Sequence, residues 1–155
     1  MKYNNSKRII EILLVEDNPG DVRLTSEALK ADDFPNNINV AWDGVEAIEF
    51  LRRKGRYSDS PRPDLILLDL NMPRKDGREV LDEIKTDADL KSIPVIVLTT
   101  SDEEQDILKT YMSYANCYIT KPIELEKLLN VLKSMKNFWF NIAKLPSLKN
   151  IKKSN

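Results

Sequence analysis

The fold of this chain is decided by one stretch of its sequence, Leu65-Ile66-Leu67-Leu68-Asp69-Leu70-Asn71-Met72-Pro73. Four consecutive apolar residues are typical of a strand that is buried on both faces, as in a parallel sheet covered by helices on either side. The carboxylate of Asp69 follows them directly, and Pro73 stops the strand. A carboxylate at the point where a buried strand surfaces is costly to desolvate, so we expect other parts of the chain to supply charged partners for Asp69.

The composition is that of one globular domain. The chain has 155 residues, of which 41% are hydrophobic and 32% charged, and its formal net charge is −1, which gives no reason to expect nucleic acid or an acidic membrane as a partner. No apolar run reaches the roughly 20 residues of a membrane helix, and residues 1–8 lack a signal-peptide core. Cys117 is the single cysteine and histidine is absent, so we expect a cytoplasmic protein without disulfides or a cysteine metal cluster.

Strands and helices are predicted to alternate along the chain. The predicted strands cover residues 9–15, 38–41, 65–70, 94–98 and 117–120. Apolar residues at helical spacing follow each strand, and cap motifs open four of these helices, at Asn18-Pro19, Asp43, Asp76 and Ser101. The motif Asp43-Gly44-Val45-Glu46 has the form of a capping box. We expect Val45 in the second helix, and Val80, Leu81 and Ile84 in the third, to be buried. This alternation is typical of an α/β fold with a parallel sheet and helices on both faces. We divide the chain into a tail (1–8), one domain (9–137) and an aromatic and basic extension (138–155).

Polar side chains stand at the ends of four predicted strands. The first strand leads to Glu16 and Asp17, the third ends with Asp69, the fourth leads to Thr99 and the fifth to Lys121. The carboxyl ends of parallel strands meet at one edge of the sheet, where α/β proteins form their sites. Three carboxylates brought together either hold protons or bind a hard cation, and oxygen ligands with room for water suit Mg²⁺. With a hydroxyl and a lysine, such a cluster fits phosphoryl transfer to a carboxylate nucleophile.

The chain resembles the receiver domains of two-component response regulators over about residues 9–136. The resemblance rests on the acidic pair after the first strand, L-L-D-L-N-M-P-x-x-D-G around Asp69, the hydroxyl of Thr99 and K-P at 121–122. It implies a flavodoxin-like (βα)5 doubly wound parallel sheet with strand order 2-1-3-4-5. It also implies that a partner sensor histidine kinase supplies a phosphoryl group in a Mg²⁺-dependent step.

The resemblance implies a role for each matched residue. Asp69 is similar to the phosphoacceptor, on which an aspartyl phosphate forms. Glu16 and Asp17 resemble the acids that bind Mg²⁺, and Asp69 and the backbone carbonyl of Asn71 complete the protein ligands. Aspartate is common in the family where this chain has Glu16, which binds the metal either directly or through water. The other matched positions are Thr99 (the switch hydroxyl), Lys121 (the lysine that pairs with the phosphoryl group), Tyr118 (the rotating aromatic) and Pro122 (preceded by a cis peptide bond).

A narrower resemblance links the chain to the phytochrome-associated response regulators of cyanobacteria and similar stand-alone receivers. It rests on residues 62–71, the extended loop before them, L-T-T-S at 98–101, and Phe138-Trp139. It places a phytochrome-like sensor kinase among the candidate partners.

Three adjacent aromatic residues, Phe138-Trp139-Phe140, follow the last predicted helix. They cannot all face one core. They either fold back against that helix or contact a partner or a second copy of the chain in a homodimer, because exposed aromatic patches tend to be interfaces.

The main hypothesis is therefore a stand-alone phosphoprotein that signals through a change of shape and partner binding, and not an enzyme. The alternative is a Mg²⁺-dependent phosphohydrolase with Asp69 as nucleophile, whose usual signature has a second aspartate where this chain has Asn71. Neither common nucleotide-binding glycine motif occurs. About twenty residues after the last helix are too few for a helix-turn-helix, so no DNA-binding domain is expected in this chain.

Overall fold

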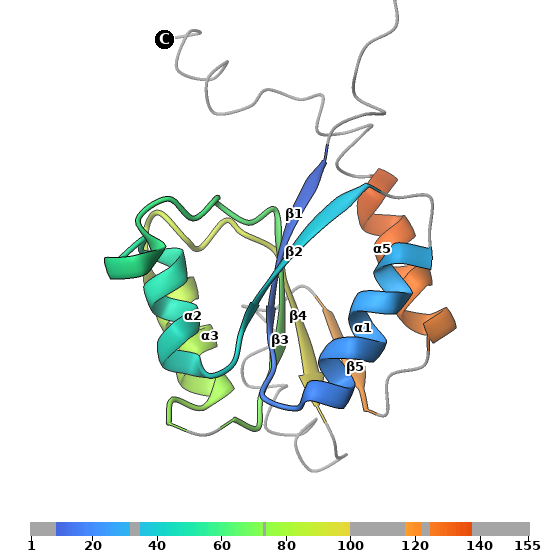
Figure 1. Cartoon of the computed structure of the whole chain (residues 1–155), viewed down its shortest axis with the longest axis horizontal. Helices are drawn as coiled ribbons and strands as arrows, with labels where there is room; N and C mark the ends of the chain where they lie inside the picture. The colour runs from blue at the N-terminus through green and yellow to red at the C-terminus, as the bar shows by residue number, and fades with distance from the viewer. Residues whose placement is uncertain (1–8, 32–34, 73, 100–116, 122–124, 138–155) are drawn as a thin grey trace, which may run out of the picture.

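The computed structural model describes residues 9–31, 35–72, 74–99, 117–121 and 125–137. They form one parallel sheet of five strands in the order β2-β1-β3-β4-β5 (Figure 1), which confirms the predicted flavodoxin-like order. The strands are β1 (Ile10–Val15), β2 (Asn36–Ala41), β3 (Leu65–Asp69), β4 (Val95–Thr99) and β5 (Cys117–Thr120). The helices are α1 (Pro19–Ala31), α2 (Gly44–Leu51), the 3-10 helix η2 (Gly55–Tyr57), α3 (Gly77–Thr86) and α5 (Leu125–Asn137). The helix predicted to follow β4 lies outside the described residues.

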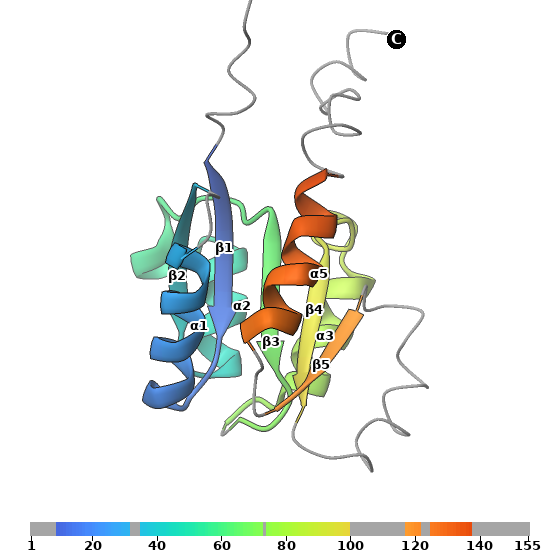
Figure 2. The same cartoon turned by 90° about the vertical axis from the view of Figure 1, so that its right-hand side faces the viewer.

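Helices cover both faces of the sheet, with α2 and α3 on one side and α1 and α5 on the other (Figures 1 and 2). Successive side chains of a strand point to opposite faces of the sheet, so one strand contributes side chains to two separate hydrophobic cores. In β1, Leu13 and Val15 belong to the core with α2 and α3, whereas Ile12 and Leu14 belong to the core with α1 and α5. None of the described helices is long and apolar enough to cross a membrane.

The central strand is β3, which lies between β1 and β4 and is buried along its whole length. Its side chains also divide between the two cores: Leu65 and Leu67 pack with α1 and α5, and Ile66 and Leu68 with α2 and α3. Burial on both faces therefore explains the uninterrupted apolar run before Asp69.

Two of the predicted helix caps form as expected. The side chain of Asn18 accepts a hydrogen bond from the amide of Asp21 (3.0 Å) at the start of α1. At the start of α3, Asp76 accepts from the Arg78 amide (2.7 Å), and Glu79 accepts from the Asp76 amide (3.2 Å), which confirms the capping box.

The structure corrects three details of the predicted elements. At the start of α2, Asp43 caps the amide of Glu46 as predicted, but the Glu46 side chain accepts from the Trp42 amide instead of completing the box at Asp43. Val45, predicted to be buried, is half-buried. The buried residues of α2 are Gly44, Ala47, Ile48, Phe50 and Leu51. Strand β2 begins two residues earlier than predicted, at Asn36.

Candidate functional site

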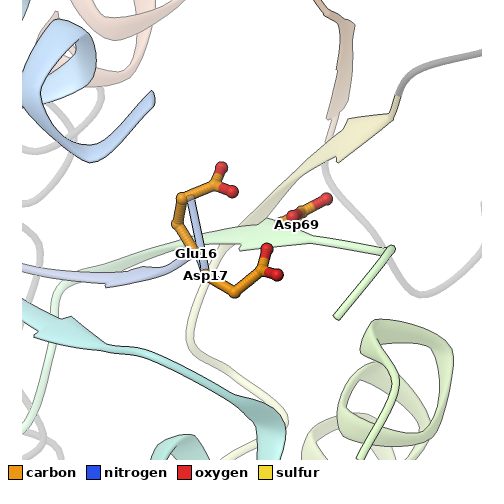
Figure 3. Close-up of side chains that lie close together, drawn as sticks. All are labelled: Glu16, Asp17 and Asp69. Atoms are coloured by element: carbon orange, nitrogen blue, oxygen red, sulfur yellow. The ribbon is translucent and has the colours of Figure 1, made fainter. Parts of the chain in front are cut away.

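Three carboxylates meet at the carboxyl end of the sheet, as Figure 3 shows. Glu16 and Asp17 directly follow β1, and Asp69 is the last residue of β3. One oxygen from each side chain lies within 4.8 Å of the other two. The strand register explains this convergence, since β1 and β3 pair in parallel up to the residues that precede Glu16 and Asp69. Three carboxylate oxygens at this spacing form the kind of ligand set that hard divalent cations use.

The three acids differ in their access to water. Glu16 is 0% exposed and Asp69 is 2% exposed, whereas Asp17 is exposed. The backbone of Glu16 is held by a hydrogen bond from its amide to the Ala41 carbonyl of the neighbouring strand (3.0 Å). Glu16 and Asp69 therefore form the buried side of the cluster. A bound cation can keep part of its water on the exposed side, at Asp17.

The ammonium group of Lys121 faces the same cluster from the end of β5. Its Nζ lies 2.8 Å from Glu16 Oε1, 3.0 Å from Asp21 Oδ2 and 3.4 Å from Asp69 Oδ2. The side chain of Lys121 is only 10% exposed, so its ion pairs with Glu16 and Asp69 are shielded from water, whereas the Asp21 side chain is 30% exposed. The expectation that Asp69 would have charged partners is confirmed.

Asp21 is the one residue around Lys121 that the sequence analysis missed. It stands in the first turn of α1, where acidic residues are common because they favour the positive end of the helix dipole. The signal that points to it is position: it follows Asp17 by four residues, at the same edge of the sheet as the other acids.

The cluster holds three carboxylates, and the Lys121 ammonium is the positive group that faces them. Burial raises the pKa of Asp69 to about 7, and the adjacent Glu16 carboxylate adds to this rise. The Asn71 amide, which donates to Asp69 Oδ1 (3.1 Å), and the Lys121 ammonium lower it only partly. Burial alone would lower the pKa of Lys121, but its hydrogen bonds to Glu16 and Asp21 and the nearby carboxylate charges raise that pKa above its usual value. A divalent cation among these acids would favour the ionised form of Asp69.

A glycine allows helix α3 to start against the end of β3. The amide of Gly77 donates to the Leu70 carbonyl (3.0 Å). A Cβ atom on Gly77 would lie 2.3 Å from the carbonyl oxygen of Asp69 and 2.5 Å from the Leu70 Cα. Only glycine fits this contact with the backbone, so Gly77 helps to fix where Asp69 is held.

The loop between β3 and α3 is tied to the start of α2. Arg74 has a positive φ of 65°, and its guanidinium contacts both carboxylate oxygens of Asp43 (2.8 and 3.0 Å). Gly44 packs so closely that an added Cβ would lie 2.0 Å from the Lys75 carbonyl oxygen. Burial tends to raise the pKa of Asp43, but the hydrogen bonds from Arg74 and from backbone amides lower it overall. The segment that follows Asp69 is therefore held in place from outside the acidic cluster.

The other predicted site residues are placed to different extents. Thr99 ends β4 with its backbone opposite Thr120 of β5, and its side chain lies outside the described part of the structure. Tyr118 is half-buried and packs against the core with α2 and α3. Asn71 is exposed, and its carbonyl as a metal ligand stays a prediction. Pro122, with its predicted cis bond, and the aromatic run 138–140 lie outside the described residues.

Comparisons with known proteins agree with this geometry. The family profile of the response regulator receiver domain matches residues 12–133. Response regulator Rcp1 from Synechocystis sp. is 48% identical over 136 residues, which cover 88% of this chain and 92% of that protein. The crystal structure of the Mn²⁺-bound form of Rcp1 superposes with a TM-score of 0.73 at 48% identity, covering 89% of this chain and 99% of that one.

A second solved structure, that of the phosphorylated cyanobacterial phytochrome response regulator RcpA, is 51% identical. It superposes with a TM-score of 0.75 and covers 90% of this chain and 100% of that one. The sequence match spans the described sheet and its site, and the structural match has the same topology. This chain therefore belongs to the response regulator receiver domain family.

Proposed function

We propose that Asp69 accepts a phosphoryl group from a sensor histidine kinase in a Mg²⁺-dependent step, and that the protein signals through the change that follows. The observation that carries this proposal is the placement of Asp69. It is buried, one of its oxygens lies within 4.8 Å of the Glu16 and Asp17 carboxylates, and its Oδ2 lies 3.4 Å from the Lys121 ammonium. The same family accepts phosphoryl groups from histidine kinases, and the relatives compared above are response regulators, which favours this function over a phosphohydrolase.

The transfer step is a substitution at phosphorus. A carboxylate oxygen of Asp69 forms a bond to the phosphorus of the kinase's phosphohistidine, the phosphorus–nitrogen bond breaks, and its electron pair returns to the imidazole, which takes up a proton. The reaction needs ionised Asp69, which burial and Glu16 disfavour in the protein alone. Bound Mg²⁺ would supply positive charge that favours this carboxylate and the oxygens of the transferred group. Glu16, Asp17, Asp69 and the Asn71 carbonyl are the residues that would hold it.

Lys121 then serves as the partner of the new charge. Its ammonium already stands beside Asp69, so a phosphoryl group on that side chain can pair with it over a short distance. In this proposal the Thr99 hydroxyl also contacts the phosphoryl group and Tyr118 turns inward. In the same proposal, the face that includes the predicted helix after β4, strand β5 and helix α5 changes shape, and with it the affinity for a partner.

The partner kinase that we propose is phytochrome-like, and the setting is the cytoplasm. The support for the kinase is that RcpA, at 51% identity, is a phytochrome response regulator. We propose that the aromatic run 138–140 contacts a partner or a second copy of the chain. We also propose that the receiver domain spans residues 9–137.

Incubation with acetyl phosphate and Mg²⁺, followed by intact-protein mass spectrometry, tests the proposal. The wild-type protein should gain one phosphoryl group, and EDTA should prevent the gain. Asp69→Asn should gain nothing, whereas Asp82→Asn, which changes an exposed acid on α3, should behave like the wild type. An equal gain in Asp69→Asn would refute the assignment of the phosphoacceptor. Steady turnover of a panel of phosphate esters would instead support the phosphohydrolase.

A further inference from the structure

We propose that Asp21 is a positioning residue that holds the Lys121 ammonium in the resting protein and releases it when a phosphoryl group forms on Asp69. This inference rests on the function proposed above and adds a residue to it. Among the described residues, the Asp21 side chain forms an ion pair of 3.0 Å with Lys121 Nζ.

The Lys121 ammonium lies closer to Glu16 and Asp21 than to Asp69, and its two hydrogen bonds go to Glu16 and Asp21. A protonated lysine offers three N–H groups and no acceptor. Three carboxylates surround the nitrogen: Glu16 (2.8 and 3.1 Å to its two oxygens), Asp21 (3.0 Å) and Asp69 (3.4 Å). A phosphoryl group on Asp69 adds new acceptor oxygens beside this nitrogen. Since the nitrogen is held at 2.8 Å from Glu16 and 3.0 Å from Asp21, a short contact with the phosphoryl group would draw it away from one of these two carboxylates.

Exposure decides which contact loosens. The Glu16 side chain is 1% exposed, so loss of its ion pair would leave a buried charge without compensation, which is strongly destabilising. The Asp21 side chain is 30% exposed, so water can replace the ammonium there at small cost. Loosening of the contact with Asp21 is therefore the least costly way for the Lys121 ammonium to move toward the phosphoryl group.

Two effects of the Asp21 charge then act in the same direction. In the resting state the carboxylate stabilises the ammonium in its present position, and in the phosphorylated state it repels the additional negative charge nearby. Removal of the charge by Asp21→Asn should thus favour the phosphoryl-bound arrangement. Since the ion pair is partly exposed, we expect a gain in affinity for a phosphoryl mimic of about two- to fivefold.

The experiment measures the affinity for beryllofluoride at saturating Mg²⁺ by isothermal titration calorimetry. Asp21→Asn should bind about two- to fivefold more tightly than the wild type. The matched control is Glu27→Gln, which removes an acidic charge from the same helix, where Glu27 pairs with Arg23 at an exposed site (3.1 Å). It should bind like the wild type. Equal affinities of Asp21→Asn and the wild type would overturn the inference, as would an equal gain in Glu27→Gln.

Two further variants separate a positioning role from a general structural one. Asp21→Glu keeps the charge within reach of Lys121 and should restore the wild-type affinity; an affinity equal to that of Asp21→Asn would contradict the inference. In a Lys121→Met background, Asp21→Asn should have a smaller effect on the affinity, because only the charge repulsion remains, and an undiminished effect would show that Asp21 does not act through Lys121. If the wild-type protein binds no beryllofluoride and gains no phosphoryl group, the proposed function itself fails, and the inference fails with it.

Discussion

Replacement of Asp69 by asparagine should stabilise the metal-free protein, and more so at high pH than at low pH. The pKa of Asp69 is raised from its ordinary value of 3.8 to about 7, mainly by burial and by the Glu16 carboxylate. As the pH rises above 4, the unfolded chain loses this proton first, while the folded protein still holds it. The folded state therefore binds more protons between about pH 4 and pH 7, and its stability falls across this window.

The magnitude follows from the two pKa values. The raised pKa of Asp69 lowers the free energy of unfolding by about 2 kcal/mol at pH 5 and about 4 kcal/mol at pH 8, from the linkage of the two titrations. Asparagine carries no such cost, and its side-chain oxygen can still accept the hydrogen bond from the Asn71 amide that Asp69 accepts at 3.1 Å. The stability difference between Asp69→Asn and the wild type should thus grow by about 2–3 kcal/mol from pH 5 to pH 8.

The assay is urea unfolding in EDTA, monitored by circular dichroism, at several pH values between 5 and 8. The difference between variant and wild type cancels the titration of the other groups. Asp82→Asn, an exposed change on α3, is the control and should show a difference that does not vary with pH. Saturating Mg²⁺ should narrow the gap at pH 8, because the cation favours ionised Asp69 in the folded wild type.

Two results would refute this reasoning. The first is a stability difference between Asp69→Asn and the wild type that stays constant from pH 5 to pH 8. The second is a variant that becomes less stable than the wild type as the pH rises. Either result would mean that the folded protein tolerates ionised Asp69 without metal, through partners stronger than Lys121 and the Asn71 amide.

Three further substitutions test other parts of the structure by urea unfolding. Gly77→Ala should lower the free energy of unfolding by about 1–3 kcal/mol, because the added Cβ would lie 2.3 Å from the Asp69 carbonyl oxygen; an unchanged stability would contradict that contact. Thr25→Val should raise it by about 1 kcal/mol, because the hydroxyl of Thr25 is buried without a hydrogen-bond partner among the described residues; a loss would reveal a partner. Asp43→Ala should lower it by about 1–2 kcal/mol through loss of the α2 cap and the Arg74 ion pair, and a change within error would argue against both.

The fold could be predicted because its main determinant is visible in the sequence. A strand buried on both faces needs an unbroken apolar run, and residues 65–68 supply it in the centre of the sheet. The one-sided pattern of α3 likewise predicted the buried positions Val80, Leu81 and Ile84. The boundary of β2 was less predictable, because Asn36 and Asn37 belong to the strand although asparagine is uncommon in strands.

The acidic cluster could be predicted from topology alone. Parallel strands end at the same edge, so residues directly after β1, β3 and β5 had to come close together, and Glu16, Asp69 and Lys121 do so. Their position at one edge of the sheet follows from the order and direction of the strands. The same rule placed Thr99 at the end of β4.

The contacts that the sequence did not predict are those set by side-chain direction across elements. Asp43 was interpreted as a helix cap alone, yet it also binds Arg74 from a loop 31 residues later. Asp21 was not considered, although it pairs with Lys121 across a separation of 100 residues. Such pairs depend on which way each helix turns its first residues, and the apolar pattern does not determine that direction for a partly exposed residue.

The most direct test of the whole account is a crystal structure of the protein with Mn²⁺ and beryllofluoride. We predict an anomalous peak for one Mn²⁺ ion between the carboxylates of Asp17 and Asp69. Beryllofluoride should be bound to an Asp69 oxygen, with the Lys121 ammonium in contact with a fluoride atom. Manganese bound elsewhere, or beryllofluoride absent from Asp69 while the acidic cluster keeps its geometry, would contradict the claim that this cluster is a metal-assisted phosphoryl acceptor.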